Sequence, residues 1–263
     1  MKRNYHTHHK YCKHAVGVTE DYVKEALEQG FTVLGMSDHA PVDTLVDHAD
    51  NVRMDAEDLP KYLDEVKTIK RRYSEDITVY TGLEVEYLEP DPEYYERLRA
   101  NTDYLILGQH YVRDESAHNS LVSSFNLQNP HHIIQYAKDV VRAIESGYFS
   151  LVGHPDLYLC AYPRFDEAAQ NAATLICTAA KKHDIPLEFN ANGIRRGLIQ
   201  AVDGTRYPYP VKAFWDIAKA HGCKIILSSD CHRPAFLYDD AVKKAEVLVD
   251  QWQLTLSTRL HFT

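Results

Sequence analysis

The chain has 263 residues, of which 44% are hydrophobic, and its formal net charge is −9 at pH 7 with the histidines neutral. That length is enough to bury a sizeable core, and α/β barrels of this size fold as one unit, so we expect a single domain over residues 1–263. The acidic charge and the lack of a long stripe of Lys and Arg argue against a nucleic-acid partner. The chain starts without a signal-peptide pattern and has no apolar run of about 18 residues, so we expect a cytoplasmic protein with no membrane partner.

Five cysteines are present, and none of them forms a C-x-x-C pair. An odd number without such pairs argues against both a disulfide framework and a zinc ribbon. We therefore expect reduced thiols, which fits the cytoplasmic assignment.

Apolar, strand-like runs alternate with helix-like segments along the chain. Thr19 is predicted as the N-cap of the first helix and Gly30 as its C-terminal stop. The predicted helices span residues 20–29, 56–73, 92–100, 130–147, 166–183, 210–221 and 237–252. The predicted strands span residues 5–8, 31–36, 77–84, 104–108, 149–153, 186–189 and 224–227. Repeats of strand then helix indicate a parallel sheet with right-handed crossover connections.

Candidate metal ligands recur along the chain, most of them where a predicted strand ends. They are His6, His8, His14, His39, Glu84, His110, His154, Asp230 and His232. In a barrel of parallel strands the strand ends meet on one face, whereas an open sheet would concentrate ligands at one switch point. Because these residues follow most of the strands, we predict a closed or distorted (β/α)7 TIM-like barrel rather than an open sheet. The long loops 40–54, 111–129 and 190–209 are expected on its catalytic face.

The spacing of these residues suits metal ions. His6 and His8 are two residues apart on a predicted strand, so both project to one face and can bind one ion. Glu84 and Glu86 also share a face, and one of these carboxylates is expected to bridge two cations. Imidazole and carboxylate ligands suit zinc, iron and manganese alike.

The chain resembles the polymerase and histidinol phosphatase (PHP) family. The resemblance lies in the motifs His6-Thr7-His8 with His14, Ser37-Asp38-His39, Gly153-His154-Pro155-Asp156 and Ser229-Asp230-Cys231-His232, with Glu84 and His110 between them. It implies a trinuclear centre of divalent ions. One ion would be held by His6, His8, Glu84 and Asp230, a second by Glu84, His110 and His154, and a third by His14, His39 and His232. Glu84 would then be the bridge, and Glu86 would have no such role.

Residues 187–197 resemble the phosphatase branch of the family. This implies hydrolysis of a small phosphate monoester, L-histidinol phosphate, in histidine biosynthesis. Arg195 or Arg196 would bind the phosphate oxygens, a role that suits a planar guanidinium. The acid for the leaving oxygen is left open between Asp230, His232 and metal-bound water. Candidates to bind the substrate's ammonium and imidazole are Asp43, Asp114 and Glu115, although each has the alternative of a solvated loop charge.

Three other functions fit part of this pattern. A PHP-type enzyme could hydrolyse nucleotide or other small phosphodiesters. A metal-dependent amidohydrolase also begins with a His-x-His strand, but it usually has eight βα units and often a carboxylated lysine, which has no counterpart here at a strand end. A non-catalytic metal-binding module is disfavoured, because nine ligands for three ions leave coordination positions open.

Overall fold

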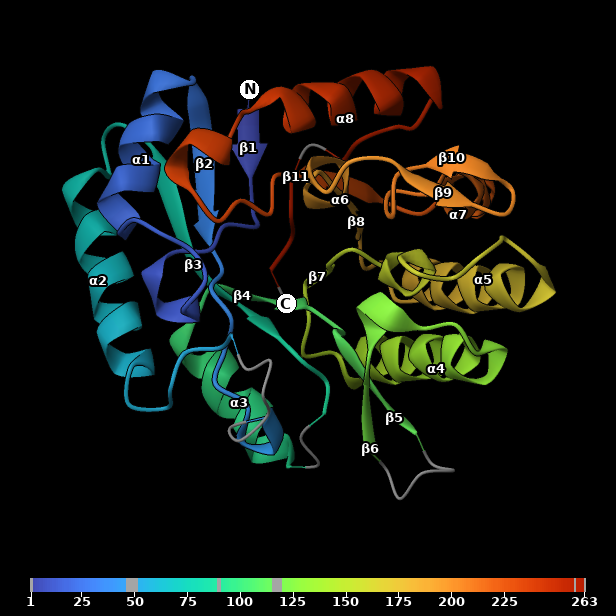
Figure 1. Ribbon diagram of the computed structural model, residues 1–263. Helices are drawn as coiled ribbons and strands as arrows, with labels where there is room; N and C mark the ends of the chain where they lie inside the picture. The colour runs from blue at the N-terminus through green and yellow to red at the C-terminus, as the bar shows by residue number, and fades with distance from the viewer. Residues whose placement is uncertain (1, 46–51, 89–90, 115–119, 258, 263) are drawn as a thin grey trace.

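The computed structural model describes residues 2–45, 52–88, 91–114, 120–257 and 259–262. Seven parallel strands form one sheet in the order β1-β2-β3-β4-β7-β8-β11, and helices surround it (Figure 1). The strands are β1 (Lys2–Asn4), β2 (Phe31–Met36), β3 (Thr78–Val85), β4 (Tyr104–Leu107), β7 (Leu151–Val152), β8 (Leu187–Asn190) and β11 (Ile225–Ser228). The predicted parallel α/β architecture is confirmed.

The main helices lie close to the predicted ranges. They are α1 (Thr19–Glu28), α2 (Leu59–Arg72), α3 (Pro92–Asn101), α4 (Pro130–Ser146), α5 (Glu167–Lys182), α7 (Lys212–Ala220) and α8 (Asp240–Gln251). The predicted N-cap is wrong by one residue. Val18 occupies that position, and Asp21 accepts a hydrogen bond from its backbone N–H. Thr19 is the first helical residue and donates its hydroxyl to Glu65 instead.

Over the residues that the structure describes, the sheet is not closed into a barrel by a strand ladder, and its edges β1 and β11 are linked by a few contacts near and beyond their ends. The first strand lies at Lys2–Asn4, before the predicted range 5–8, and within that range Thr7 takes part in an isolated bridge. Thr7 and Cys231 form an isolated parallel bridge, and His8 N donates to Cys231 O at 2.9 Å. The backbone N–H of Ser229 donates to Asn4 Oδ1 at 2.7 Å. Among the described residues no continuous ladder joins β1 to β11, so the barrel is distorted, as predicted.

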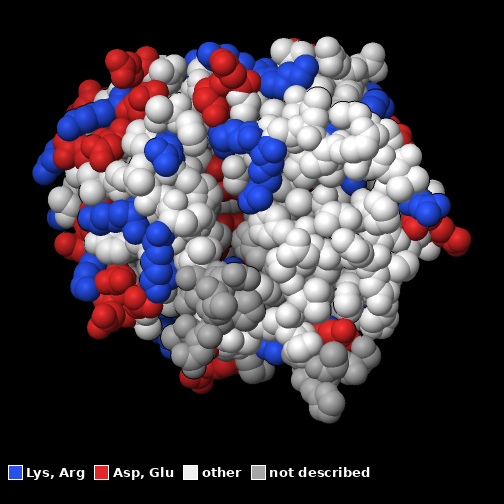
Figure 2. Space-filling view, viewed as in Figure 1, with Lys and Arg blue, Asp and Glu red and all other residues white. Residues whose placement is uncertain are grey.

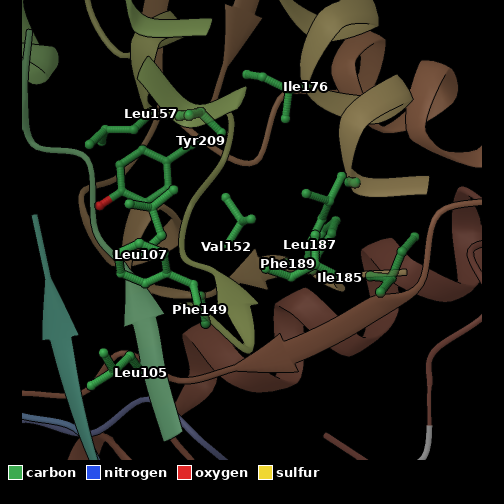
Figure 3. Packing of buried hydrophobic residues seen from close by; sticks show 14 of the residues in the cluster. Leu105, Leu107, Phe149, Val152, Leu157, Ile176, Ile185, Leu187, Phe189 and Tyr209 are labelled. Atoms are coloured by element: carbon green, nitrogen blue, oxygen red, sulfur yellow. The ribbon is translucent and has the colours of Figure 1, made fainter. Parts of the chain in front are cut away.

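Apolar side chains fill the space on both sides of the sheet. The larger cluster lies between the strands and the outer helices, and Figure 3 shows Leu107, Val152, Leu187 and Phe189 within it. A smaller cluster fills the barrel interior and consists of Tyr5, Tyr104, Ile106, Leu151, Ile226 and Leu260. The position of Leu260 shows that the described part of the C-terminal segment packs into the barrel, and its red trace runs toward the centre of the view in Figure 1.

Two small hairpins and a one-turn helix lie in the loops that sequence patterns left irregular. The hairpins are β5 (Tyr111–Asp114) with β6 (Ser120–Ser123), and β9 (Ile199–Ala201) with β10 (Gly204–Arg206); the short helix is α6 (Asn192–Arg195). Within the described part of the chain, no helix has the length and apolar character needed to cross a membrane.

Candidate metal centre

A cavity of about 590 Å³ opens where the parallel strands end. Its wall includes seven of the nine candidate ligands: His14, His39, Glu84, His110, His154, Asp230 and His232. His6 and His8 lie just below them and are fully buried. Figure 2 shows acidic side chains in a hollow near the middle of the face that it views. Residues far apart in the sequence are thus brought together by the strand ends.

Glu84 lies at the centre of this group, and its two carboxylate oxygens face different imidazoles. Oε2 lies 3.3 Å from His6 Nε2, 3.3 Å from His8 Nε2 and 3.0 Å from His39 Nδ1. Oε1 lies 2.8 Å from His154 Nε2 and 3.5 Å from His110 Nε2. Glu84 is 2% exposed and lies on β3. This strand pairs with β2 on one side and β4 on the other, so Glu84 lies between the ligands that follow these two strands. This divided geometry is what a carboxylate bridging two cations requires.

Asp230 faces the same point from β11. Its Oδ1 lies 3.2 Å from His8 Nε2 and 3.7 Å from His6 Nε2, and this buried atom has no hydrogen-bond partner. Its Oδ2 accepts hydrogen bonds from the side-chain amides of Asn190 and Asn192. The amides thereby hold the carboxylate with Oδ1 aimed at the imidazole pair.

Two of these candidates have unusual backbone conformations. The backbone angle φ is +46° at Asp230 and +28° at His154, values that residues other than glycine rarely adopt. Each such residue costs about 1–3 kcal/mol and persists where the surrounding structure enforces it, often at functional sites. Each of these residues is the second one after the end of a strand, β7 or β11, and its side chain faces the cavity.

Further imidazoles, those of His14, His39 and His232, lie beside the residues around Glu84. The ligand atoms of His8, His39 and His232 lie within 4.8 Å of one another, as do those of Cys12, His14 and His232. The rings of His14 and His232 are 4.4 Å apart between centroids, and His232 Nε2 is buried without a hydrogen-bond partner. The buried thiol of Cys12 also lies beside these imidazoles, a position that the sequence did not indicate.

The outward nitrogens of several imidazoles are fixed by acceptors, three of which sequence reasoning missed. Glu188 Oε1 lies 2.8 Å from His6 Nδ1, Asp38 Oδ1 lies 3.4 Å from His8 Nδ1, and Glu86 Oε1 lies 2.7 Å from His110 Nδ1. Backbone carbonyl groups face Nδ1 of His14 and His232. An Nδ1–H that donates outward leaves Nε2 as a lone pair facing the cavity, which is the tautomer that binds metal.

The electrostatics of the cluster are those of a cation site. Burial alone would lower the pKa of the His6 imidazole, but the carboxylates of Glu188, Asp230 and Glu84 outweigh it and hold that pKa well above its usual value. Burial, reinforced by the positive charge of His8, lowers the pKa of His232 to about 3. Burial would raise the pKa of Glu84, yet the surrounding imidazoles hold it well below the ordinary value. The carboxylates therefore stay charged, and positive charge is favoured between them.

The donor set fits divalent metal ions. Imidazole nitrogens and carboxylate oxygens converge within 3–4 Å, and Asp230 Oδ1 and His232 Nε2 are buried without hydrogen-bond partners. Buried polar atoms are otherwise almost always paired, so these orphaned atoms indicate a missing partner with positive charge. Nitrogen and oxygen donors of this kind suit zinc, iron or manganese.

The two candidate arginines have different surroundings. Arg195 donates from Nε and Nη2 to Asp239 and from Nη1 to Ser229 O, and it also contacts Ser229 Oγ and Phe236 O. Arg196 donates from Nε to Tyr209 Oη at 3.2 Å, and its guanidinium lies 4.6 Å from the centre of the Phe125 ring. Both arginines line the cavity, but all three guanidinium nitrogens of Arg195 donate hydrogen bonds to protein groups.

The loop acids proposed for substrate binding lie elsewhere or outside the described residues. Asp43 is exposed and is not part of the cavity wall. Asp114 also lies off the wall, and its Oδ2 is 3.0 Å from His132 Nε2. Glu115 falls outside the described residues. The remaining wall contains aromatic and neutral polar side chains, among them Tyr111, Phe125, Asn126, Asn192 and Phe236, together with Val52 and the charged Arg53.

The family model of the PHP domain matches residues 4–192, which is most of the chain. The chain belongs to the PHP domain family. This confirms the resemblance seen in the motifs. Among curated relatives, the histidinol-phosphatase of Bacillus subtilis is 24% identical over 260 residues, covering 89% of this chain and 94% of that protein. A probable histidinol-phosphatase of Deinococcus radiodurans is 26% identical over 256 residues, covering 91% and 90%.

Solved structures show the same fold for this PHP chain. A candidate histidinol phosphatase of Listeria monocytogenes superposes with a TM-score of 0.75 at 23% identity and covers 92% of this chain and 99% of its own. The histidinol phosphate phosphatase of Lactococcus lactis, solved with zinc, L-histidinol and phosphate, has a TM-score of 0.65 at 18% identity and covers 98% and 96%.

Proposed function

We propose that this protein is a metal-dependent histidinol-phosphatase, which hydrolyses L-histidinol phosphate to L-histidinol and phosphate in histidine biosynthesis. The observation that carries the proposal is the division of the Glu84 carboxylate between two sets of imidazoles, in a chain whose curated relatives are named for this activity. The substrate is a small-molecule monoester, and the cavity volume of about 590 Å³ is typical of sites for such ligands.

Nine residues would hold three divalent ions. The first position takes His6, His8, Glu84 and Asp230, the second Glu84, His110 and His154, and the third His14, His39 and His232. The distances around Glu84 and the orphaned atoms of Asp230 and His232 support this set. Such ions supply hydroxide at neutral pH and neutralise the charge on phosphoryl oxygens.

The chain's own residues orient the substrate around this centre. Arg196 would bind phosphate oxygens, because it lines the cavity and, among the described residues, its Nε donates to Tyr209 while its Nη groups make no hydrogen bond. Arg195 instead braces the end of β11 through Ser229. Asp230 has Oδ2 held by two amides, while Oδ1 faces the imidazole pair without a hydrogen-bond partner, which suits a ligand better than a proton donor.

Substitution of Asp230 tests the proposal. Asp230→Asn keeps the shape but removes the charge, and we expect kcat to fall by about 100-fold, or about 2.7 kcal/mol of transition-state stabilisation, with less metal retained. Asp103→Asn is the matched control, because Asp103 binds Thr81 N and Lys70 at the other end of the barrel. Near-normal turnover and metal content in Asp230→Asn would reject the assigned role.

A further inference from the structure

Glu188 is a fully buried carboxylate that contacts both sides of the candidate metal centre. It lies on β8, where Leu187 and Phe189 pack into the outer core and the alternate residues, Glu188 and Asn190, face the barrel interior. Its relative exposure is 0%. A charge held so far from water needs a strong compensating partner.

Three contacts satisfy this carboxylate. Its Oε1 lies 2.8 Å from His6 Nδ1. Its Oε2 accepts hydrogen bonds from the backbone N–H of His154 at 3.0 Å and from the side-chain amide of Asn190 at 2.8 Å. Asn190 in turn donates to Asp230 Oδ2. Among the described residues, the ion pairs of Glu188 include an imidazole but no Lys or Arg.

These contacts reach two metal positions. His6 and Asp230 belong to the first proposed position, and His154 belongs to the second, where its Nε2 lies 2.8 Å from Glu84 Oε1. The backbone bond to His154 acts at the residue with φ +28°, so it also holds the bend that turns this imidazole toward Glu84. By comparison, Glu86 contacts a single candidate ligand, His110, through its backbone N–H and its ring.

We infer that Glu188 is a positioning residue that couples the first and second metal positions. It fixes the His6 tautomer with Nδ1–H outward and Nε2 free, and at the same time fixes the backbone of His154 and, through Asn190, the orientation of Asp230. The inference rests on the proposed function, because it takes these three residues as metal ligands. Carboxylates that hold metal-binding histidines in this way contribute to metal affinity without touching the ion.

Glu188→Gln is the sharpest test, because glutamine has the same shape but accepts on one side only. If its NH₂ group faces His6, it favours the tautomer with a proton on Nε2, which has no lone pair for metal. If the NH₂ group faces His154 and Asn190, it meets their N–H groups, and these donors lose their acceptor. Either orientation weakens metal binding, by roughly ten- to one-hundred-fold for a substitution of this kind.

The measurement is metal binding by the full chain, independent of turnover. Purified wild type, Glu188→Gln, Glu86→Gln and Asp103→Asn proteins are stripped, reloaded with Zn²⁺ or Mn²⁺, and titrated with a chelator, with bound metal counted by mass spectrometry and folding followed by circular dichroism. We expect Glu188→Gln to lose two ions per chain at chelator concentrations where Glu86→Gln loses one and Asp103→Asn none. At saturating metal concentration, we expect Glu188→Gln to regain most of the wild-type kcat with little change in KM.

Each other outcome has a defined meaning. Wild-type protein that binds no metal would overturn the proposed function itself. If the wild type binds metal, two results would overturn the inference and leave the proposed function intact. One is that Glu188→Gln binds metal as well as the wild type or loses only one ion. The other is that Asp103→Asn loses as many ions as Glu188→Gln. If Glu188→Gln does not fold, Glu188→Asp keeps the charge but withdraws it by one methylene group. The same loss of two ions is then expected, and normal metal binding by Glu188→Asp would overturn the inference.

Discussion

The main chain of Gly108 lies directly against the side chain of Glu84. A Cβ atom at position 108 would lie 2.6 Å from both Cγ and Cδ of Glu84, closer than side chains tolerate. Gly108 follows β4, the strand that pairs with β3 beside Glu84. The absence of a side chain at position 108 therefore sets the place of the carboxylate at the centre of the cavity.

Gly108→Ala should displace Glu84 and reduce both bound metal and turnover. The control is Gly30→Ala, where the added Cβ meets open space but φ is +75°. That substitution should cost about 1–2 kcal/mol of unfolding free energy through backbone strain alone. Metal analysis and chemical denaturation of the two variants check this prediction. Equal metal content in both would contradict the account of Gly108.

Metal affinity should fall as pH falls. Carboxylates outweigh burial and hold the pKa values of His6 and His8 well above their ordinary value of 6.5, so both rings favour the protonated form in the metal-free protein. A metal ion needs the deprotonated rings and must displace these protons, so its binding is favoured by rising pH. Chelator competition at pH 6, 7 and 8 measures the effect, and an affinity that does not change with pH would contradict it.

Substitution of Arg196 should affect substrate binding, whereas substitution of Arg195 should affect the free energy of unfolding. Arg196→Lys loses the planar donor next to the cavity, so we expect kcat/KM to drop by roughly ten-fold, about 1.4 kcal/mol, with little change in stability. Arg195→Lys loses hydrogen bonds to Ser229, Phe236 and Asp239, so we expect a loss of about 1–3 kcal/mol of unfolding free energy. Steady-state kinetics and denaturation compare them, and the reverse pattern would exchange the two roles.

The C-terminal segment should stabilise the barrel. Leu260 is 6% exposed and packs with Tyr5 and Tyr104 inside the barrel, and Phe262 stacks on Tyr104 with centroids 5.4 Å apart. Leu260→Ala should therefore cost about 2–4 kcal/mol of unfolding free energy. Metal content of the folded protein should not change, because the apolar cluster around Leu260 contains none of the candidate ligands. Denaturant titration with and without metal checks both statements.

Much of the fold and the candidate centre could be predicted from the sequence because both follow a simple rule. Alternating strands and helices predict parallel strands, and ligand residues that follow strands must then meet. The open choice between Glu84 and Glu86 could not be settled in that way. Both side chains point to the same face, and only the three-dimensional contacts show that Glu84 faces several imidazoles while Glu86 contacts Arg53 and His110.

Other features depend on contacts that no local pattern carries. Glu188 alternates with apolar neighbours on β8, which indicates that it faces inward, but its partner His6 is 182 residues away. Arg195 and Arg196 are adjacent at a one-turn helix, where consecutive side chains point about 100° apart, so their different surroundings depend on β11 and Tyr209. The hairpins of β5–β6 and β9–β10 have strands of three or four residues, too short to show a clear alternation.

The most direct test of the central claim is phosphate release from L-histidinol phosphate by the wild-type protein, with generic monoesters and a phosphodiester alongside. The protein is stripped with chelator and then reloaded with Zn²⁺ or Mn²⁺. We predict no turnover without metal and, after reloading, a kcat/KM for L-histidinol phosphate about 1000-fold above the other substrates, or about 4 kcal/mol. Turnover that survives metal removal, or a preference for the phosphodiester, would contradict the proposed function.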